Sequence, residues 1–306
     1  MRPSENFDPK KTKKLFGLDK KFYFFKNLII TEKLPKVILL SGKKGSGKST
    51  LVFHLMHSIF NKENYCEEKK MVNSENALYY QLNSNIHSNV IYLNGNNFIN
   101  IKIEDIRNLK NKLFKAPINK NKRFIILDDV EDFNTNSLNA LLKIIEEPGE
   151  YNYFILINNQ SRPLLETIKS RCIDIKFILK KTDRDTIIAS LLDFFKQKLV
   201  LNDETIQISP GNFLKYNWFF NEKNLDIGQN FLSNLNMLLN MYKKDKDNFY
   251  KEFLLFYCEF YLMNMKSKKD YLENKSFLIK SINEFFLYNL NQNSLLRSLE
   301  RKFKNE

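Results

Sequence analysis

The sequence predicts an α/β protein, in which a parallel sheet carries a phosphate-binding loop and a region made only of helices follows. As far as residue 178, short apolar runs typical of strands alternate with helical patterns. Such alternation is typical of a parallel sheet covered by helices on both faces. From residue 180 onwards the chain is rich in Phe and Leu and has no Gly-rich loops, so this half is expected to be helical.

The clearest single feature is segment 37–50, VILLSGKKGSGKST. Its apolar start predicts a buried strand and its end opens an amphipathic run, so G-x-x-x-x-G-K-[ST] stands between a strand and a helix, as in a P-loop. Glycines let backbone N–H groups turn toward phosphate oxygens, and the helix N-terminus adds partial positive charge. The residues expected to bind nucleotide phosphates are Gly42, Gly45, Ser46, Gly47, Lys48, Ser49 and Thr50.

An acidic segment completes the expected nucleotide site. The apolar run 123–128 predicts a strand that ends in Asp128, and Asp129 and Glu131 follow it. In P-loop proteins the lysine reaches the β- and γ-phosphates, while the serine hydroxyl and an aspartate at the end of another strand hold Mg²⁺. ATP and Mg²⁺ are therefore the expected ligands, with Lys48 on the phosphates and Ser49 and Asp128 on the metal.

The other elements follow from hydrophobic spacing and from helix breakers. Pro35 ends an apolar helical pattern that begins near residue 15, and Pro163 suits the first turn of a later helix. Segment 61–88 is polar and irregular, and we expect an exposed excursion there rather than core. Further strands are expected at 90–93, 153–157 and 173–178, and further helices at 101–114 and 136–146.

Composition narrows the possible function classes. The formal charge is +14, but only eight of the 49 basic residues are Arg, and much of the Lys excess fits a compositional bias on a solvated surface. A dedicated nucleic-acid groove is therefore not predicted from charge alone. The chain has no run of 18 apolar residues, its N-terminus lacks a secretory h-region, and its three cysteines lie far apart. We expect a cytoplasmic protein with free thiols and no membrane partner.

Three short motifs resemble one known family. Asn139-Ala-Leu-Leu-Lys143, Glu146-Glu-Pro148 and Ser170-Arg171-Cys172 are similar to the AAA+ core of bacterial DNA polymerase III clamp loaders, most closely their delta-prime branch. The resemblance implies a P-loop AAA+ domain over residues 1–178, a small helical lid over 179–225 and a helical collar over 226–306. It also implies a hetero-pentamer with other clamp-loader subunits, which loads the sliding clamp onto primed DNA in an ATP-dependent reaction of DNA replication.

The resemblance assigns further residues, and the chain departs from the family at some of them. Arg171 would act as an arginine finger in the ATP site of a neighbouring subunit. Asp129 stands where ATP-hydrolysing relatives have Glu, so it is a weak catalytic position. Asn158 is the sensor-like residue, Gly211 and Asn212 replace a second sensor arginine, and of the four-cysteine zinc module only Cys66 is present, so no zinc is expected. These departures predict a subunit of the polymerase holoenzyme that binds ATP and hydrolyses it poorly.

Three other functions remain open on the sequence. An autonomous motor-type ATPase of the gamma/tau kind needs a residue that positions water, and Asp129 argues against it. A P-loop nucleotide kinase needs an arginine-bearing lid, yet no arginine occurs between Arg184 and Arg297. A DNA-binding module that acts alone has only the net charge in its favour.

Overall fold

The computed structural model describes residues 7–95, 101–115, 117, 120–201, 207–225, 231–263 and 268–303, the side chains of 268–273 excepted. The chain divides into two compact units. The core unit comprises residues 7–195 and 209–214, and the helical unit comprises the described residues of 196–208 and 215–303. These two units do not test the predicted division into three domains. The predicted boundary between the lid and the collar falls at residues 226–230, which lie outside the described residues.

The described part of the core unit contains a five-stranded parallel sheet with the order β4-β5-β6-β1-β7. The predicted strands are confirmed, with boundaries that shift by one or two residues. Their bounds are β1 Val37–Ser41, β4 Val90–Asn94, β5 Arg123–Asp128, β6 Asn152–Asn158 and β7 Ile173–Lys176.

The sheet register brings polar residues together at the carboxyl ends of the strands. Ser41 at the end of β1 pairs with Asn158 at the end of β6, and Asn94 at the end of β4 pairs with Asp128 at the end of β5. In an open parallel sheet the carboxyl ends of the strands form the edge at which ligands bind. The predicted P-loop follows β1, so it lies at this edge.

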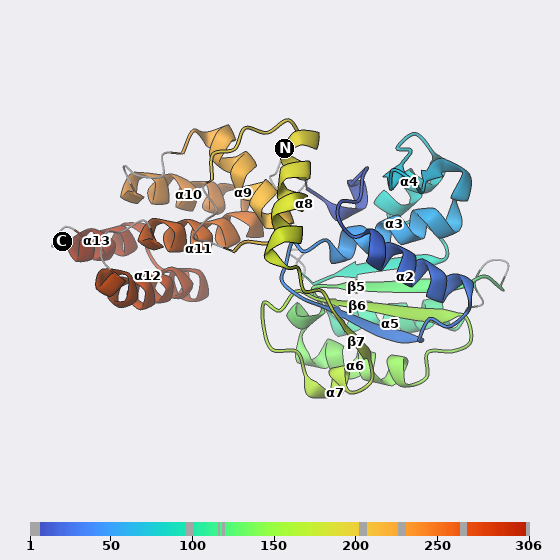
Figure 1. Cartoon of the computed structure of the whole chain (residues 1–306). Coiled ribbons are helices and arrows are strands. Elements are labelled where there is room, and N and C mark those ends of the chain that lie inside the picture. The colour runs from blue at the N-terminus through green and yellow to red at the C-terminus, as the bar shows by residue number, and fades with distance from the viewer. Residues whose placement is uncertain are drawn as a thin grey trace. The chain divides into compact units, whose positions relative to one another are not determined.

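Helices cover both faces of the sheet (Figure 1), because alternate residues of each buried strand face opposite sides. On β1, Ile38 and Leu40 pack in a cluster with α2 and α3, whereas Val37 and Leu39 pack in a second cluster with α5 and α6. The helices of the core unit are α2 Asp19–Ile30, α3 Lys48–Phe60, α4 Ala77–Asn83, α5 Ile103–Leu113, α6 Thr135–Glu146, α7 Glu166–Lys169 and α8 Lys181–Phe194, with 3₁₀ turns η1 Pro9–Lys11, η2 Lys62–Asn64 and η4 Val130–Asp132. Helix α7 begins three residues after Pro163, later than predicted.

The expectation of an exposed excursion at 61–88 is wrong. This segment forms an antiparallel pair, β2 Tyr65–Cys66 and β3 Met71–Val72, followed by α4. Four of its apolar side chains are buried in the cluster that contains α2 and α3, although Tyr80 and Ile86 are exposed, so the polar composition was misleading. The four are Tyr65, Val72, Leu78 and Leu82.

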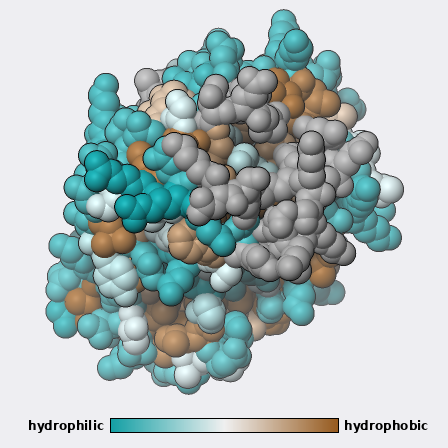
Figure 2. Space-filling view, turned by 90° about the vertical axis from the view of Figure 1, so that its left-hand side faces the viewer, coloured by the Kyte–Doolittle hydropathy of each residue, from teal (hydrophilic) through white to brown (hydrophobic). Residues whose placement is uncertain are grey.

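The helical unit is built around aromatic side chains. Helix α9 spans Pro210–Lys223, and its first five residues belong to the core unit. Phe219 of α9 and Phe253 of α11 are fully buried, and their ring centroids lie 4.6 Å apart. Hydrophilic residues predominate on the face in Figure 2, and hydrophobic residues are scattered among them. The other helices are α10 Phe231–Asp245, α11 Asn248–Met263, α12 Lys268–Tyr288 and α13 Gln292–Phe303.

None of the helices in the described part of the chain has the length and hydropathy needed to cross a lipid bilayer. The three cysteines are free thiols, as expected: Cys66 on β2 is exposed, Cys172 is half-buried and Cys258 is buried.

Candidate nucleotide-binding site

The P-loop connects the end of β1 to the start of α3 and needs glycine at two positions for steric reasons. Gly45 and Gly47 have φ values of +80° and +87°, in the left-handed region that L side chains rarely adopt. A Cβ atom at Gly47 would also lie only 2.7 Å from Leu18 Cδ1. The loop therefore has the compact turn that the motif predicted, and Thr50 lies in the first turn of the helix that follows.

Lys48 is buried at the centre of this loop. Its ammonium Nζ donates hydrogen bonds to the carbonyl oxygens of Gly42 at 2.7 Å and Lys43 at 3.0 Å, and to Ser46 Oγ at 3.3 Å. Burial lowers the pKa of Lys48 to about 8, although the charge of Asp128 raises it. A desolvated cation inside a glycine loop is suited to an anionic phosphate group.

Ser49 and Asp128, the two residues expected to hold Mg²⁺, are hydrogen-bonded to each other. Ser49 Oγ donates a hydrogen bond of 2.6 Å to Asp128 Oδ2, and the backbone N–H of Asp129 donates to Asp128 Oδ1 at 3.0 Å. Burial, together with the charge of Asp129, raises the pKa of Asp128 to about 6. A hydroxyl and a buried carboxylate are oxygen ligands of the kind that Mg²⁺ prefers, and a bound cation would relieve the unfavourable burial of the acid. This pair therefore fits a magnesium ion.

Asp129 is engaged by donors from two other segments. Its backbone is left-handed, with φ +50°, and its Oδ1 atom accepts a hydrogen bond of 2.7 Å from Asn159 Nδ2. Lys44 Nζ of the P-loop lies 3.7 Å from the same oxygen. The carboxylate at the weak catalytic position is thus held by the P-loop and by the residue after β6.

Of the two adjacent asparagines after β6, Asn159 contacts the acids, whereas Asn158, the predicted sensor-like residue, does not. The side-chain oxygen of Asn158 accepts a hydrogen bond of 2.8 Å from the backbone N–H of Gln160, so it closes its own turn. Asn159 Nδ2 instead contacts Asp129 and also lies 3.4 Å from Asp128 Oδ1. The sequence offered two adjacent asparagines and no means to tell which one the turn directs toward the acids.

Two further side chains lie near Asp128 and Asp129: Tyr92, which sequence reasoning missed, and Glu131, which it named in the acidic segment without assigning a role. Tyr92 of β4 donates a hydrogen bond of 3.2 Å to Asp128 Oδ2. Glu131 is buried and accepts hydrogen bonds of 3.1 and 3.0 Å from the N–H and hydroxyl groups of Ser161. Burial raises the pKa of Glu131. Tyr92 lies two residues before the end of β4. This position predicts a contact with Asp128 only once it is known that β4 lies beside β5.

Comparison with known proteins decides the family. A family model described as DNA polymerase III, delta subunit, matches residues 17–181, which is more than half of the chain. The chain belongs to this clamp-loader family. The resemblance seen in its motifs is thus confirmed.

Its relatives carry two kinds of name. A Bacillus subtilis protein named DNA polymerase III subunit delta' is 29% identical over 151 residues, which cover 49% of this chain and 44% of that protein. A Mycoplasma genitalium protein named DNA polymerase III subunit gamma/tau is 29% identical over 181 residues, which cover 57% of this chain and 28% of that protein. The chain spans less than half of the length of either of these curated relatives.

The fold is also shared with a solved structure. A gamma subunit-related DNA polymerase III protein from Thermotoga maritima has a TM-score of 0.50 at 19% identity, and the match covers 90% of this chain and 96% of that chain. The predicted α/β AAA+ core with a following all-helical region is confirmed.

The first turn of α9 touches the P-loop of this clamp-loader core. The backbone N–H of Gly211 donates a hydrogen bond of 2.8 Å to the Gly45 carbonyl oxygen, and Ser209 Oγ donates to the Lys44 carbonyl oxygen. A Cβ atom at Gly211 would lie 2.8 Å from the Gly45 oxygen, so a larger residue would push the two backbones apart. The segment where a second sensor arginine was missing is therefore in direct contact with the phosphate-binding loop.

Arg171 lies on the surface of the core unit, after α7, and 38% of its side chain is exposed. Its Nε and Nη2 atoms each lie 2.7 Å from Glu146 Oε1, and its Nη1 donates to the Thr167 carbonyl oxygen at 3.0 Å. Within the described residues these groups, together with the Ser170 hydroxyl, are its polar partners. The structure does not bring Arg171 together with Lys48 and Asp128.

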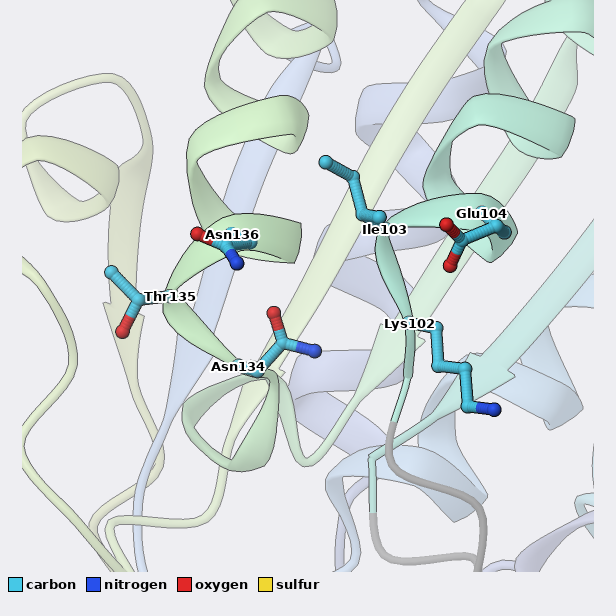
Figure 3. A pocket seen from close by; sticks show the side chains of 6 residues that line it. All are labelled: Lys102, Ile103, Glu104, Asn134, Thr135 and Asn136. Atoms are coloured by element: carbon cyan, nitrogen blue, oxygen red, sulfur yellow. The ribbon is translucent and has the colours of Figure 1, made fainter.

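A separate pocket of about 450 Å³ opens beside the starts of α5 and α6 (Figure 3). Asn134 caps α6 there, because its Oδ1 atom accepts a hydrogen bond of 2.8 Å from the Ser137 N–H. The pocket is lined by Lys102, Ile103, Glu104, Asn134, Thr135 and Asn136.

Proposed function

We propose that this chain is a delta-prime-type subunit of a DNA polymerase III clamp loader. It takes part, in a hetero-pentamer with other clamp-loader subunits, in the ATP-dependent loading of the sliding clamp onto primed DNA during replication. Membership of the family and the match to a relative named delta' support this assignment. The residues around the P-loop suggest how it contributes.

The subunit binds ATP and Mg²⁺ at the P-loop. The observation that carries this proposal is the buried set in which Lys48 lies inside the glycine loop and Ser49 donates to Asp128 at 2.6 Å. Lys48 and the loop N–H groups hold the phosphates, and Ser49 and Asp128 hold the metal. When bound, Mg²⁺ neutralises charge on the phosphate oxygens.

The subunit hydrolyses ATP poorly because Asp129 is badly placed for the chemistry. Its side chain is one methylene shorter than Glu, and its Oδ1 atom is already engaged by Asn159 at 2.7 Å and by Lys44 at 3.7 Å. A group that orients water must reach it at hydrogen-bond distance in the reacting geometry. The bound nucleotide then has a structural role.

Arg171 serves a neighbouring subunit. Among the described residues, the carboxylate partner of this surface guanidinium is Glu146. Arg171 can exchange it for a phosphate oxygen supplied by another chain, since an exposed ion pair contributes at most about 1 kcal/mol. Arginine fingers in trans stabilise charge on the transferring phosphoryl group.

A second candidate is a gamma/tau-type motor subunit with ATPase activity of its own. The match to a relative named gamma/tau favours it. A motor-type subunit would require Asp129 to give up its contacts with Asn159 and Lys44 and to orient a water molecule instead. ATP turnover by the isolated chain separates the two candidates.

The assembly role is tested by reconstitution. The full chain is mixed with the other clamp-loader subunits of its own organism, and complex formation and clamp loading onto primed DNA are measured with and without it. Complexes that form only with the chain, and clamp loading that depends on it, are the expected results. A chain that stays monomeric in that mixture would contradict the proposal.

A further inference from the structure

We propose that Tyr92 is a positioning residue for the magnesium site, which it serves by fixing the carboxylate of Asp128. This inference rests on the proposed binding of ATP and Mg²⁺. It adds a residue that no P-loop motif includes, because Tyr92 lies on β4, next to the strand that carries the acid.

The sheet places the two side chains on one face. In the β4–β5 register Tyr92 pairs with Ile126 and Asn94 pairs with Asp128, and side chains two residues apart on a strand share a face. Helix α3, which carries Ser49, covers the same face. The Phe53 ring, one turn after Ser49, packs edge-on against the Tyr92 ring with centroids 5.3 Å apart. Packing between α3 and β4 therefore fixes the phenol ring.

A third side chain orients the hydroxyl proton. Asn94 Nδ2 donates a hydrogen bond of 2.8 Å to the Tyr92 oxygen. An amide nitrogen only donates, so the phenol uses a lone pair there and directs its single proton to Asp128 Oδ2 at 3.2 Å. The result is a series of two hydrogen bonds, in which Asn94 donates to Tyr92 and Tyr92 donates to Asp128.

The donors around Asp128 show what this series of hydrogen bonds achieves. A carboxylate has about four acceptor positions, and here Ser49 and Tyr92 bond to Oδ2, whereas the Asp129 N–H and Asn159 bond to Oδ1. Asn159 has the longest contact, 3.4 Å, and a better acceptor in Asp129. The Asn159 contact is thus the weakest of the four and the one most readily given up. Tyr92 and Ser49 would hold Oδ2 in place if Asp128 bound a magnesium ion or its water.

Removing the hydroxyl should therefore weaken metal binding rather than nucleotide binding. Outer hydrogen-bond partners of a metal ligand typically change metal affinity by about 10- to 100-fold when they are removed. For Tyr92→Phe we expect about a tenfold loss of Mg²⁺ affinity, with the affinity for the nucleotide alone unchanged.

The experiment measures the dissociation constant of a fluorescent ADP analogue on the full chain, first in EDTA and then during a Mg²⁺ titration. Tyr65→Phe is the matched control, because Tyr65 belongs to the cluster that Tyr92 packs against and its hydroxyl bonds His54 at 3.1 Å, away from the acids. Asn94→Ala, which keeps the phenol but loses its orienting donor, should show a smaller loss in the same direction. Thermal unfolding of each variant verifies its fold.

The possible outcomes separate this inference from the proposed function. A Mg²⁺ affinity that falls in Tyr92→Phe but not in Tyr65→Phe, with equal binding in EDTA, supports the inference. An unchanged or increased Mg²⁺ affinity overturns it while the proposed function stands. If the unaltered chain binds no nucleotide with or without Mg²⁺, both the proposed function and this inference fail. Should Tyr92→Phe fail to fold, Asn94→Ala decides by the same criteria.

Discussion

Asn159 Nδ2 lies 2.7 Å from Asp129 Oδ1, so the residue after β6 holds the acid at the position where a hydrolysing relative would orient water. Lys44 approaches the same oxygen from the P-loop. Weak hydrolysis is expected from this arrangement, because an acid already occupied by two donors is a poor partner for water.

Lengthening this acid should restore part of the activity. In Asp129→Glu the carboxylate extends by one methylene and can reach beyond Asn159, so we expect the single-turnover rate of ATP hydrolysis to rise at least about tenfold, below the roughly 10²- to 10⁴-fold of a well-placed base. Asp129→Asn is the control, and its rate should equal that of the unaltered chain. A large loss of activity in Asp129→Asn would show that the aspartate already works as a base.

Nucleotide affinity should fall as the pH rises through about 8. Burial lowers the pKa of Lys48 to about 8, so the charged form that attracts phosphate is present below that pH and is lost above it. The dissociation constant of ATP should therefore increase above pH 8, by up to about tenfold per pH unit. Titration calorimetry on either side of pH 8 measures it. Lys48→Met should bind weakly at every pH, and an equal pH dependence in that variant would place the titrating group elsewhere.

Arg171→Ala should leave the isolated chain intact and impair the complex. Loss of an exposed ion pair changes the free energy of unfolding by less than about 1 kcal/mol. In the reconstituted complex, loss of a trans arginine should lower the ATPase rate at the site it serves by about 10³-fold or more. Arg162→Ala, which removes an exposed arginine paired with Asp132, is the control. An unchanged ATPase rate in the Arg171→Ala complex would exclude the finger role.

The helical unit should be sensitive to loss of an aromatic side chain from its core. Phe253 is fully buried among other rings, whereas Phe277 is 36% exposed. Phe253→Ala should lower the free energy of unfolding by about 3–5 kcal/mol. Phe277→Ala should change it by less than about 1 kcal/mol, as exposed substitutions usually do. Denaturant unfolding monitored by circular dichroism distinguishes them, and equal losses would contradict the packing described.

The parts of the site that depend on local sequence were predictable. The P-loop needs its glycines, lysine and serine within one turn, and Asp128 follows a strand that is apolar throughout, so both could be read without the fold. The expectation that Ser49 and Asp128 hold the same magnesium ion followed from the chemistry of P-loop proteins.

The contacts that depend on strand order and on turns were not predictable. Tyr92 reaches Asp128 because β4 lies beside β5, and the turn after β6 selects Asn159 over Asn158. In segment 61–88, the four buried apolar residues are spread over short elements and show no clear periodicity, and the segment packs against the core nevertheless.

ATP binding and turnover by the purified full chain test the proposed function most directly. The variant is Lys48→Ala, and the control is Lys20→Ala, which alters an exposed lysine on α2. We expect Mg²⁺-dependent ATP binding that Lys48→Ala abolishes and Lys20→Ala leaves intact, with turnover far below about 1 s⁻¹, the low end of typical enzymes. Turnover above that rate, lost in Lys48→Ala, would contradict the proposed weak hydrolysis and make the chain a motor-type ATPase.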